Sequence, residues 1–314
     1  MEAIPELDFH DFISEDENKK QSFVDQVRDS LCDIGFFALN NHGIPLQLIR
    51  DAYEQCDVFF ELPEEIKRRY AQPHLHHQRG YTPFGVEHAK DQIAPDLKEF
   101  WQTGLPPQDG LDSSFPTNIW PTHEAPAFEN IIGSLYEQML ELSVELLKAC
   151  SLALGKSENW LPDMTTHGNT IMRLIHYPPL DNNVPAGAVR SAAHEDINFI
   201  TLLVTATADG LEVMDHDGSW ISVQGNEEAI IVDTGDMIQN LTNGYFRSTT
   251  HRVVNPSDAS SRRYSMPLFV HPRNEIDLSP LSEYVEMTGG SARYQQITAG
   301  EYLYQRLKEI GLAS

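Results

Sequence analysis

The sequence is short of cysteine and basic residues, and it contains no long apolar run. Its three cysteines, Cys32, Cys56 and Cys150, are too few and too scattered for a disulfide framework or a cysteine-ligated zinc site. No segment approaches the roughly 18 apolar residues that a membrane span requires. The first residues also lack the basic and apolar stretches of a secretory signal. We therefore expect an intracellular, cytoplasmic protein with no membrane partner.

The charge balance is strongly acidic. Lys and Arg total 22 against 47 Asp and Glu, which gives a formal net charge of −25. Such a surface repels phosphate backbones and anionic membranes, so we expect no nucleic-acid partner. Apolar residues make up 40% of the 314-residue chain and charged residues 22%, a composition typical of globular proteins. A chain of this length can form one large domain or two small ones.

The first half of the chain reads mainly as helices. From Phe128 to Ala149, apolar residues recur every three or four positions, which indicates one buried face of a helix. Similar spacing predicts a helix from about Asn18 to Cys32, and Pro45 and Pro63 each open another. Residues 74–121 have little periodicity and predict a long loop region. A last helix is expected from Glu301 onward.

The second half changes character at about Thr170, where short β-branched and aromatic runs alternate with Gly, Asp and Asn turns. The expected strands are residues 170–177, 198–205, 211–214, 220–223, 229–232, 237–241, 245–254 and 263–270. Short strands at close spacing favour a sandwich or jelly roll over a βαβ sheet. We expect one domain, 1–314, with a mainly helical part at 1–165, a jelly-roll core at 166–275 and a closing segment at 276–314.

One short motif suggests a metal site. His194-Glu195-Asp196 is the only His-x-Asp in the sequence, although about one such pair is expected by chance. At the mouth of a strand, residues i and i+2 point to the same face, so His194 and Asp196 can converge on one ion. His251, in another extended segment, is a candidate third ligand. Two imidazoles and one carboxylate suit non-haem Fe(II) and leave positions open for substrates.

A candidate carboxylate site follows His251, the third candidate ligand. Arg263 and Ser265 are two residues apart and therefore share one face of an expected apolar strand. A guanidinium and a hydroxyl together make a good cradle for a carboxylate co-substrate. The alternative is an arginine at a strand edge that pairs with a surface acid.

Other segments follow in the order of one family's landmarks. They are Ile4-Pro5, Leu7-Asp8, Gly35-Phe36-Phe37, Asn41-His42-Gly43-Ile44-Pro45, Phe59-Phe60-Glu61-Leu62-Pro63, Lys67 through Tyr70, Arg79-Gly80-Tyr81, Asp96-Leu97-Lys98-Glu99 and Asn118-Ile119-Trp120-Pro121. Together with the His-x-Asp, His251-Arg252-Val253 and Arg-x-Ser motifs, they span about Ile4 to Val270. The chain thus resembles the isopenicillin N synthase-like branch of the non-haem Fe(II), 2-oxoglutarate-dependent dioxygenases.

The resemblance implies a mainly β fold with flanking helices around a double-stranded β-helix, or jelly-roll, core. It implies that His194, Asp196 and His251 hold Fe(II) in a single catalytic domain. It also implies that Arg263, Ser265 and Tyr177 hold 2-oxoglutarate. The expected enzyme uses O2 to oxidise a C–H bond of a small molecule and releases succinate and CO2. Ascorbate as a reductant, a monomeric or weakly oligomeric state, and packing of substrate against residues 80–86 are further expectations.

Two alternatives remain open. Ile175-His176-Tyr177-Pro178 stands where plant-type members show Asn-Tyr-Tyr-Pro, and isopenicillin N synthase, an oxidase that uses no 2-oxoglutarate, shares Ile-x-Tyr-Pro. That oxidase also carries Arg-x-Ser, so this motif does not separate the two enzymes. Two features oppose the oxidase alternative. Its substrate-binding arginine is shifted by one position relative to Arg79, and its C-terminal glutamine has no counterpart in this sequence. The remote alternative is a non-catalytic metal-binding regulatory module, which retention of the triad and Arg263 disfavours. We expect His42 to lock a loop by a hydrogen bond.

Overall fold

The computed structural model describes residues 3–75, 77–86, 96–105, 115–180, 188–224, 226 and 228–309. Within these residues, one eight-stranded and one four-stranded sheet make up the β structure. The large sheet runs in the order β1 (Glu6–Asp8), β2 (Phe36–Asn40), β10 (Ile230–Thr234), β7 (Ile200–Val204), β12 (Arg263–Val270), β5 (Ile171–Tyr177), β4 (Glu99–Gly104) and β3 (Gly80–Thr82). The small sheet runs β6 (Ser191–His194), β11 (His251–Val253), β8 (Leu211–Met214) and β9 (Trp220–Ser222).

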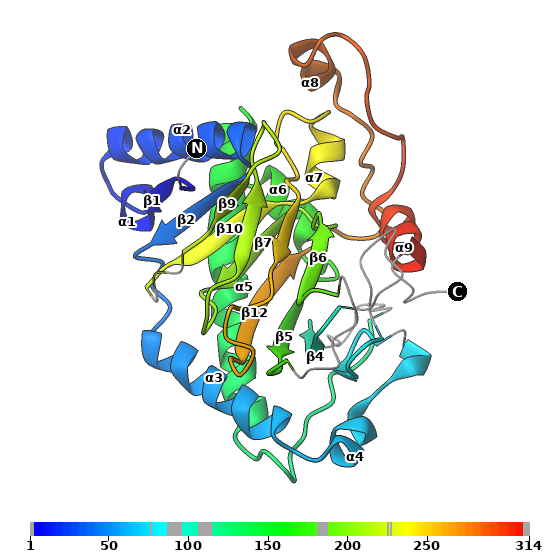
Figure 1. The fold of residues 1–314 in the computed structure, drawn as a ribbon. Helices are drawn as coiled ribbons and strands as arrows, with labels where there is room; N and C mark the ends of the chain where they lie inside the picture. The colour runs from blue at the N-terminus through cyan, green and yellow to red at the C-terminus, as the bar shows by residue number, and fades with distance from the viewer. Residues whose placement is uncertain are drawn as a thin grey trace.

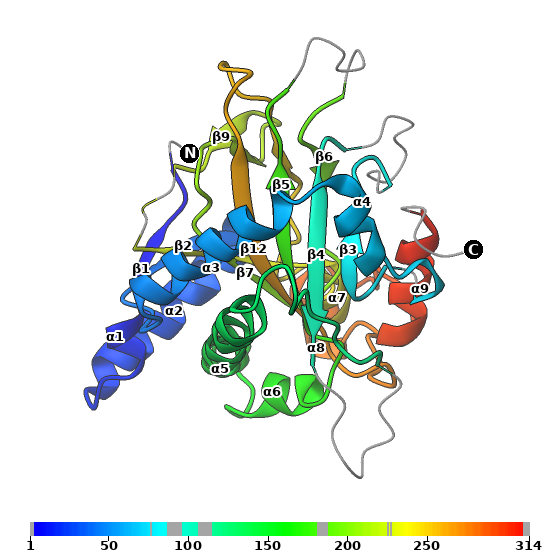
Figure 2. The same cartoon turned by 90° about the horizontal axis from the view of Figure 1, so that it is seen from below.

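Helices cover the outer face of the large sheet. The principal ones are α2 (Glu17–Asp33), α3 (Leu46–Phe60) and α5 (Phe128–Ala153), and the views in Figures 1 and 2 show them on one side of the sheet. The predicted apolar stripe of α5 is buried against this layer. The other helices are α1 (Phe9–Phe12), α4 (Glu64–Lys67), α6 (Trp160–Thr165), α7 (Asp236–Leu241), α8 (Ser282–Met287) and α9 (Ala299–Glu309), with 3-10 turns at Arg68–Tyr70 and Pro73–Leu75.

Strand β12 shows how the sequence separates core from site. Its even-numbered residues, Tyr264, Met266, Leu268 and Val270, join the apolar core beneath the helices. Its odd-numbered residues, Arg263, Ser265, Pro267 and Phe269, line a pocket on the opposite face. Because successive side chains of a strand point to opposite faces, one strand supplies both layers. The jelly-roll core thus carries its apolar packing on one face of the large sheet and its chemistry on the other.

Several predicted strands differ from the structure. Residues 237–241 form helix α7 rather than a strand, because a short apolar run does not by itself distinguish the two states. Of the predicted strand 245–254, only His251–Val253 pairs in a sheet. Strands β3 and β4 lie within the region predicted as loop, and β6 was not predicted.

The N-terminal part contributes four strands, β1 to β4, to the large sheet. Strand β2 pairs with β10 and β4 pairs with β5, so this sheet joins both sides of the predicted boundary at residue 165. The single-domain division and its internal boundaries stay predictions. None of the helices in the described ranges combines the length and the apolar character needed to cross a membrane.

Candidate active site

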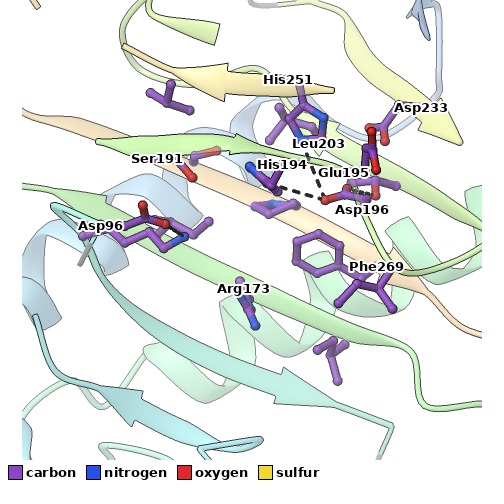
Figure 3. Close-up of a pocket in the computed structure, with 18 of the residues that line it drawn as sticks. Asp96, Arg173, Ser191, His194, Glu195, Asp196, Leu203, Asp233, His251 and Phe269 are labelled. Carbon is purple, nitrogen blue, oxygen red and sulfur yellow. Dashed lines mark hydrogen bonds and ion pairs between the residues drawn. The ribbon is translucent and has the colours of Figure 1, made fainter. Parts of the chain in front are cut away.

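A cavity of about 450 Å³ opens between the two sheets. The large sheet supplies one wall through β4, β5, β7 and β12, the small sheet supplies the other through β6 and β11, and α9 adds Leu303 and Leu307. Figure 3 shows His194 and His251 directed toward Asp196 in this cavity, with Asp233 beside Asp196. Arg173 and Asp96 lie farther along the same pocket.

The three predicted metal ligands lie together. Strands β6 and β11 are antiparallel neighbours in which His194 pairs with His251, so sheet register alone sets the two imidazoles side by side. Asp196 Oδ1 lies 3.8 Å from His194 Nε2 and 3.7 Å from His251 Nε2. One ligand atom from each residue falls within 4.8 Å of the others. This donor set fits Fe(II) as two imidazole nitrogens and one carboxylate oxygen.

The backbone orients both imidazoles for metal binding. His194 Nδ1 lies 2.8 Å from the Ala192 carbonyl oxygen, and His251 Nδ1 lies 3.1 Å from the Thr249 carbonyl oxygen. A carbonyl only accepts, so each Nδ1 carries the proton and each Nε2 presents its lone pair to the centre. Burial and the neighbouring His251 lower the pKa of His194 to about 4. His194 is therefore neutral at pH 7, as a metal ligand must be.

Asp196 lies in the loop that follows β6 and is held by contacts with β7 and α7. Its Oδ2 accepts a hydrogen bond from the Thr201 hydroxyl, which in turn accepts one from Asn198 Nδ2 at 2.9 Å. Its carbonyl accepts from the backbone N–H of Asp236 at 2.7 Å. A Cβ at Gly235 would lie 2.4 Å from Asn198 Oδ1, so this close contact requires glycine. The carboxylate orientation is fixed without any metal.

We expect Thr201→Val to weaken Fe(II) binding by about 10- to 100-fold, the usual effect of removing an outer partner of a metal ligand. Valine keeps the shape of threonine but donates no hydrogen bond to Asp196. Fe(II) affinity measured anaerobically, with the melting temperature alongside, checks this result. Thr201→Ser, which keeps the hydroxyl, should retain affinity close to that of the original protein. Equal Fe(II) binding by the valine and serine variants would exclude the orienting role.

Asp233 is a second carboxyl group near the triad. It is buried on β10, and its Oδ2 has no hydrogen-bond partner among the described residues. Burial and the charge of nearby Asp196 raise its pKa well above the usual range. The raised pKa favours the neutral acid, which limits the negative charge beside Asp196.

The predicted carboxylate cradle lies on neighbouring strands. Arg263 on β12 pairs in register with Tyr177 on β5, and the guanidinium carbon lies 5.1 Å from the Tyr177 ring centroid. Arg263 is 2% exposed; its Nε donates to the Ala208 carbonyl at 3.0 Å, but its Nη1 has no partner within the described ranges. It is buried on β12, which lies between β7 and β5 rather than at a sheet edge, and it forms no ion pair with an acid in the described ranges, so the strand-edge alternative is wrong. A buried cation with a spare donor fits an anionic ligand.

The part of the pocket around Arg173 contains polar side chains, and aromatic rings pack against the Arg173 guanidinium. Arg173 on β5 packs over Phe100 and Phe269, with its guanidinium carbon 4.5 and 5.5 Å from their ring centroids. Its Nε donates to Gln102 Oε1 at 2.8 Å. Lys98 Nζ and Asp96 Oδ2 form an ion pair at 2.9 Å. This region therefore offers charged and amide groups to a ligand, with the Phe269 ring beside them in the pocket lining.

Helix α9 covers this region and is tied to the jelly roll. Arg306 Nη2 lies 3.2 Å from Asp236 Oδ2, and the Tyr302 hydroxyl donates to the same oxygen at 3.0 Å. Leu303 and Leu307 face the pocket from the same helix. The closing segment expected from the sequence therefore forms part of the pocket wall.

The sequence predicted which three ligands meet, but strand alternation is not what brings His194 and Asp196 together. His194 ends β6, and Asp196 lies beyond that strand, so the hydrogen bond from Thr201 on β7, rather than side-chain alternation along β6, orients the carboxylate toward the centre. The expected role of His42 is confirmed, since its Nδ1 accepts from the Ile44 backbone N–H at 3.1 Å. Thr201, Arg173 and several other pocket residues were not predicted.

Strand parity could have identified the missed residues. Arg173, Ile175 and Tyr177 alternate along β5 and share the face of the predicted Tyr177. Thr201 is the polar member of an otherwise apolar strand, β7. Gln102 had no such signal, because β4 itself was not predicted. None of residues 80–86 is among those that line this cavity, and their expected contact with substrate stays a prediction.

Comparison with known proteins was made on the sequence and on the fold. Residues 4–123 match the family described as non-haem dioxygenase in morphine synthesis N-terminal, and residues 168–272 match the 2OG-Fe(II) oxygenase superfamily. The 2-oxoglutarate-Fe(II) type oxidoreductase ppzD of Metarhizium rileyi is 30% identical, with 96% of this chain and 89% of that protein covered.

Two solved structures have closely similar folds. A 2OG-Fe(II) oxygenase family protein of Caulobacter crescentus superposes with a TM-score of 0.86 at 34% identity, covering 98% of this chain and 99% of that one. A Neurospora crassa protein, solved in complex with alpha-KG (2-oxoglutarate) and thymine, gives a TM-score of 0.86 at 27% identity over 97% and 96% of the chains. The resemblance and the jelly-roll fold inferred from sequence are confirmed. The chain belongs to the 2OG-Fe(II) oxygenase superfamily, whose members are enzymes that use Fe(II), 2-oxoglutarate and O2.

Proposed function

We propose that this enzyme oxidises a C–H bond of a small polar molecule at a centre formed by His194, Asp196 and His251. The observation that carries the proposal is the pairing, in one cavity, of this triad with the buried and incompletely bonded Arg263. A triad alone fits many metals. A cationic group in the same cavity fits a co-substrate that has a second carboxylate.

The three metal ligands would present two Nε2 atoms and Oδ1 of Asp196 to Fe(II). The ion would supply the activation of O2 that couples decarboxylation of 2-oxoglutarate to substrate oxidation. The protein's own part is orientation: Ala192 and Thr249 hold the imidazoles, and Thr201 holds the carboxylate. The His194 side chain is 32% exposed in the cavity, so one side of the centre is open to substrates.

Arg263, Ser265 and Tyr177 would hold the distal carboxylate of 2-oxoglutarate. Arg263 and Ser265 project from the same face of β12, and Tyr177 projects from β5 next to Arg263. Arg263 Nη1 has no partner among the described residues, so a bound carboxylate would supply its acceptor. Ile175 replaces the plant-type asparagine and lines the pocket as an apolar residue.

The organic substrate would occupy the part of the pocket that contains Gln102 and Arg173. Phe100 and Phe269 hold the Arg173 guanidinium, and α9 covers the space. Binding of thymine by the similar Neurospora crassa protein supports a small polar substrate. Hydroxylation is the simplest outcome, and the substrate pose would decide between it and desaturation or ring closure. The acidic surface and the scarcity of cysteine support a cytoplasmic enzyme with no nucleic-acid partner.

Binding of 2-oxoglutarate can be tested before the substrate is known. We expect anaerobic Fe(II) protein to develop a weak visible charge-transfer band on addition of 2-oxoglutarate. Exposure to air should then release succinate slowly without substrate. Spectroscopy and succinate assay measure the two results. If neither band nor succinate appears at millimolar 2-oxoglutarate, this cavity is not the site that binds 2-oxoglutarate.

A further inference from the structure

Arg190, which immediately precedes β6, is a second arginine buried next to Tyr177. Its side chain is fully buried (0% exposed), and its guanidinium carbon lies 5.9 Å from the Tyr177 ring centroid. The corresponding distance for Arg263 is 5.1 Å. Two cations therefore lie within about 11 Å of each other, around one ring of the proposed co-substrate site.

Only some of the side-chain N–H donors of Arg190 form hydrogen bonds with the described residues. Nη2 donates to the Ser261 carbonyl oxygen, two residues before Arg263, and this bond accounts for the direction of the side chain. Nε and Nη1 are buried and have no partner among the described residues. Leaving charged donors unsatisfied is costly, so a purely structural role leaves this arrangement unexplained.

The charge of Arg190 is also uncompensated within the part of the chain that the structure describes. Neither Arg190 nor Arg263 forms an ion pair with a described acidic residue, although the chain contains 47 acidic residues. Burial, and then the repulsion from Arg263, lowers the pKa of Arg190. Two like charges buried near each other favour the entry of an anion.

We propose that Arg190 is a second positively charged positioning residue of the 2-oxoglutarate site, which acts with Arg263 on the distal carboxylate. Arg263 would donate hydrogen bonds from β12. Arg190 would add positive potential from the β6 side of Tyr177 and hold the chain at Ser261, close to Arg263. The inference rests on the proposed function, since it assigns a further residue to the same site.

The test compares two ligands of anaerobic Fe(II) protein. 2-Oxoglutarate and 2-oxopentanoate share the keto-acid end, but 2-oxopentanoate has a methyl group where 2-oxoglutarate has its distal carboxylate. Titration of the charge-transfer band gives a Kd for each ligand. The Kd for 2-oxopentanoate divided by the Kd for 2-oxoglutarate measures recognition of the distal carboxylate. A variant that is partly unfolded or poor in iron changes both values together and leaves the ratio unchanged.

We expect Arg190→Gln to lower this ratio by about 10-fold, the effect of one cation several ångströms from a carboxylate in a partly screened site. Arg190→Lys, which keeps the charge, should stay within about 3-fold of the original protein. Arg79→Gln is the matched control: like Arg190, Arg79 is 0% exposed, lies outside the cavity lining and has donors, Nε and Nη2, without a partner among the described residues, but its guanidinium packs against Gly104 rather than beside Tyr177. Its ratio should not change.

An unchanged ratio in Arg190→Gln would overturn the inference while leaving the proposed function intact. Failure of the original protein to bind 2-oxoglutarate would overturn both. If Arg190→Gln does not fold, Arg263→Leu provides the second measurement. With Arg190 still present, this variant should keep at least about a 10-fold preference for 2-oxoglutarate. Equal binding of the two ligands by Arg263→Leu would overturn the role of Arg190.

Discussion

His194→Ala should bind Fe(II) at least about 100-fold more weakly and lose nearly all iron-dependent oxygen consumption, because loss of a direct ligand exceeds the usual 10- to 100-fold effect of its outer partners. The fold should survive, since the His194 side chain is 32% exposed to the cavity and belongs to no apolar cluster. Anaerobic Fe(II) titration, oxygen consumption and the melting temperature measure the three effects.

His10→Ala provides a matched substitution at an exposed histidine on α1 and should leave all three measurements unchanged. Asp196→Glu tests geometry rather than charge. We expect it to be largely inactive, because one more methylene group displaces the carboxylate by about an ångström in a site that needs sub-ångström placement. Full oxygen consumption by the His194→Ala protein at unchanged iron content would exclude this triad.

Arg263→Leu should weaken 2-oxoglutarate binding by about 30-fold to several thousand-fold and leave Fe(II) affinity unchanged. Removing one partner of a buried charged pair costs about 2–5 kcal/mol. Leucine preserves apolar volume on β12 but offers the carboxylate neither charge nor hydrogen bonds. The Kd for 2-oxoglutarate, from the charge-transfer band, and the Kd for Fe(II) separate the two effects.

Ser265→Ala gives a graded comparison on the same face of β12. The loss of one hydroxyl donor to a charged group should cost about 0.5–2 kcal/mol, which is less than the loss of the guanidinium. The two substitutions should therefore differ clearly in their effect on 2-oxoglutarate binding. Small and equal effects would mean that the distal carboxylate binds elsewhere in the cavity.

The acidic surface and the β-rich second half were predictable because they depend on composition and local periodicity. The buried apolar face of α5 was also predictable, because it depends only on the helical spacing of apolar residues. Local spacing also placed Arg263 and Ser265 on one strand face, as β12 bears out. It failed for residues 237–241, where Gly235 allows a helix to begin against the Asp196 loop. That contact is long-range and leaves no mark on the apolar pattern itself.

By itself, the sequence determined the family, the jelly-roll core and the identity of the residues proposed to bind Fe(II) and 2-oxoglutarate. Only the tertiary structure decided how they come together. The register of β6 with β11 sets His194 beside His251, and Thr201 turns Asp196 toward both. Arg190 is 73 residues before Arg263 in sequence, yet both are buried around Tyr177. Side-chain periodicity is a local property, whereas strand register, buried charge and unpaired donors arise only when distant segments pack together.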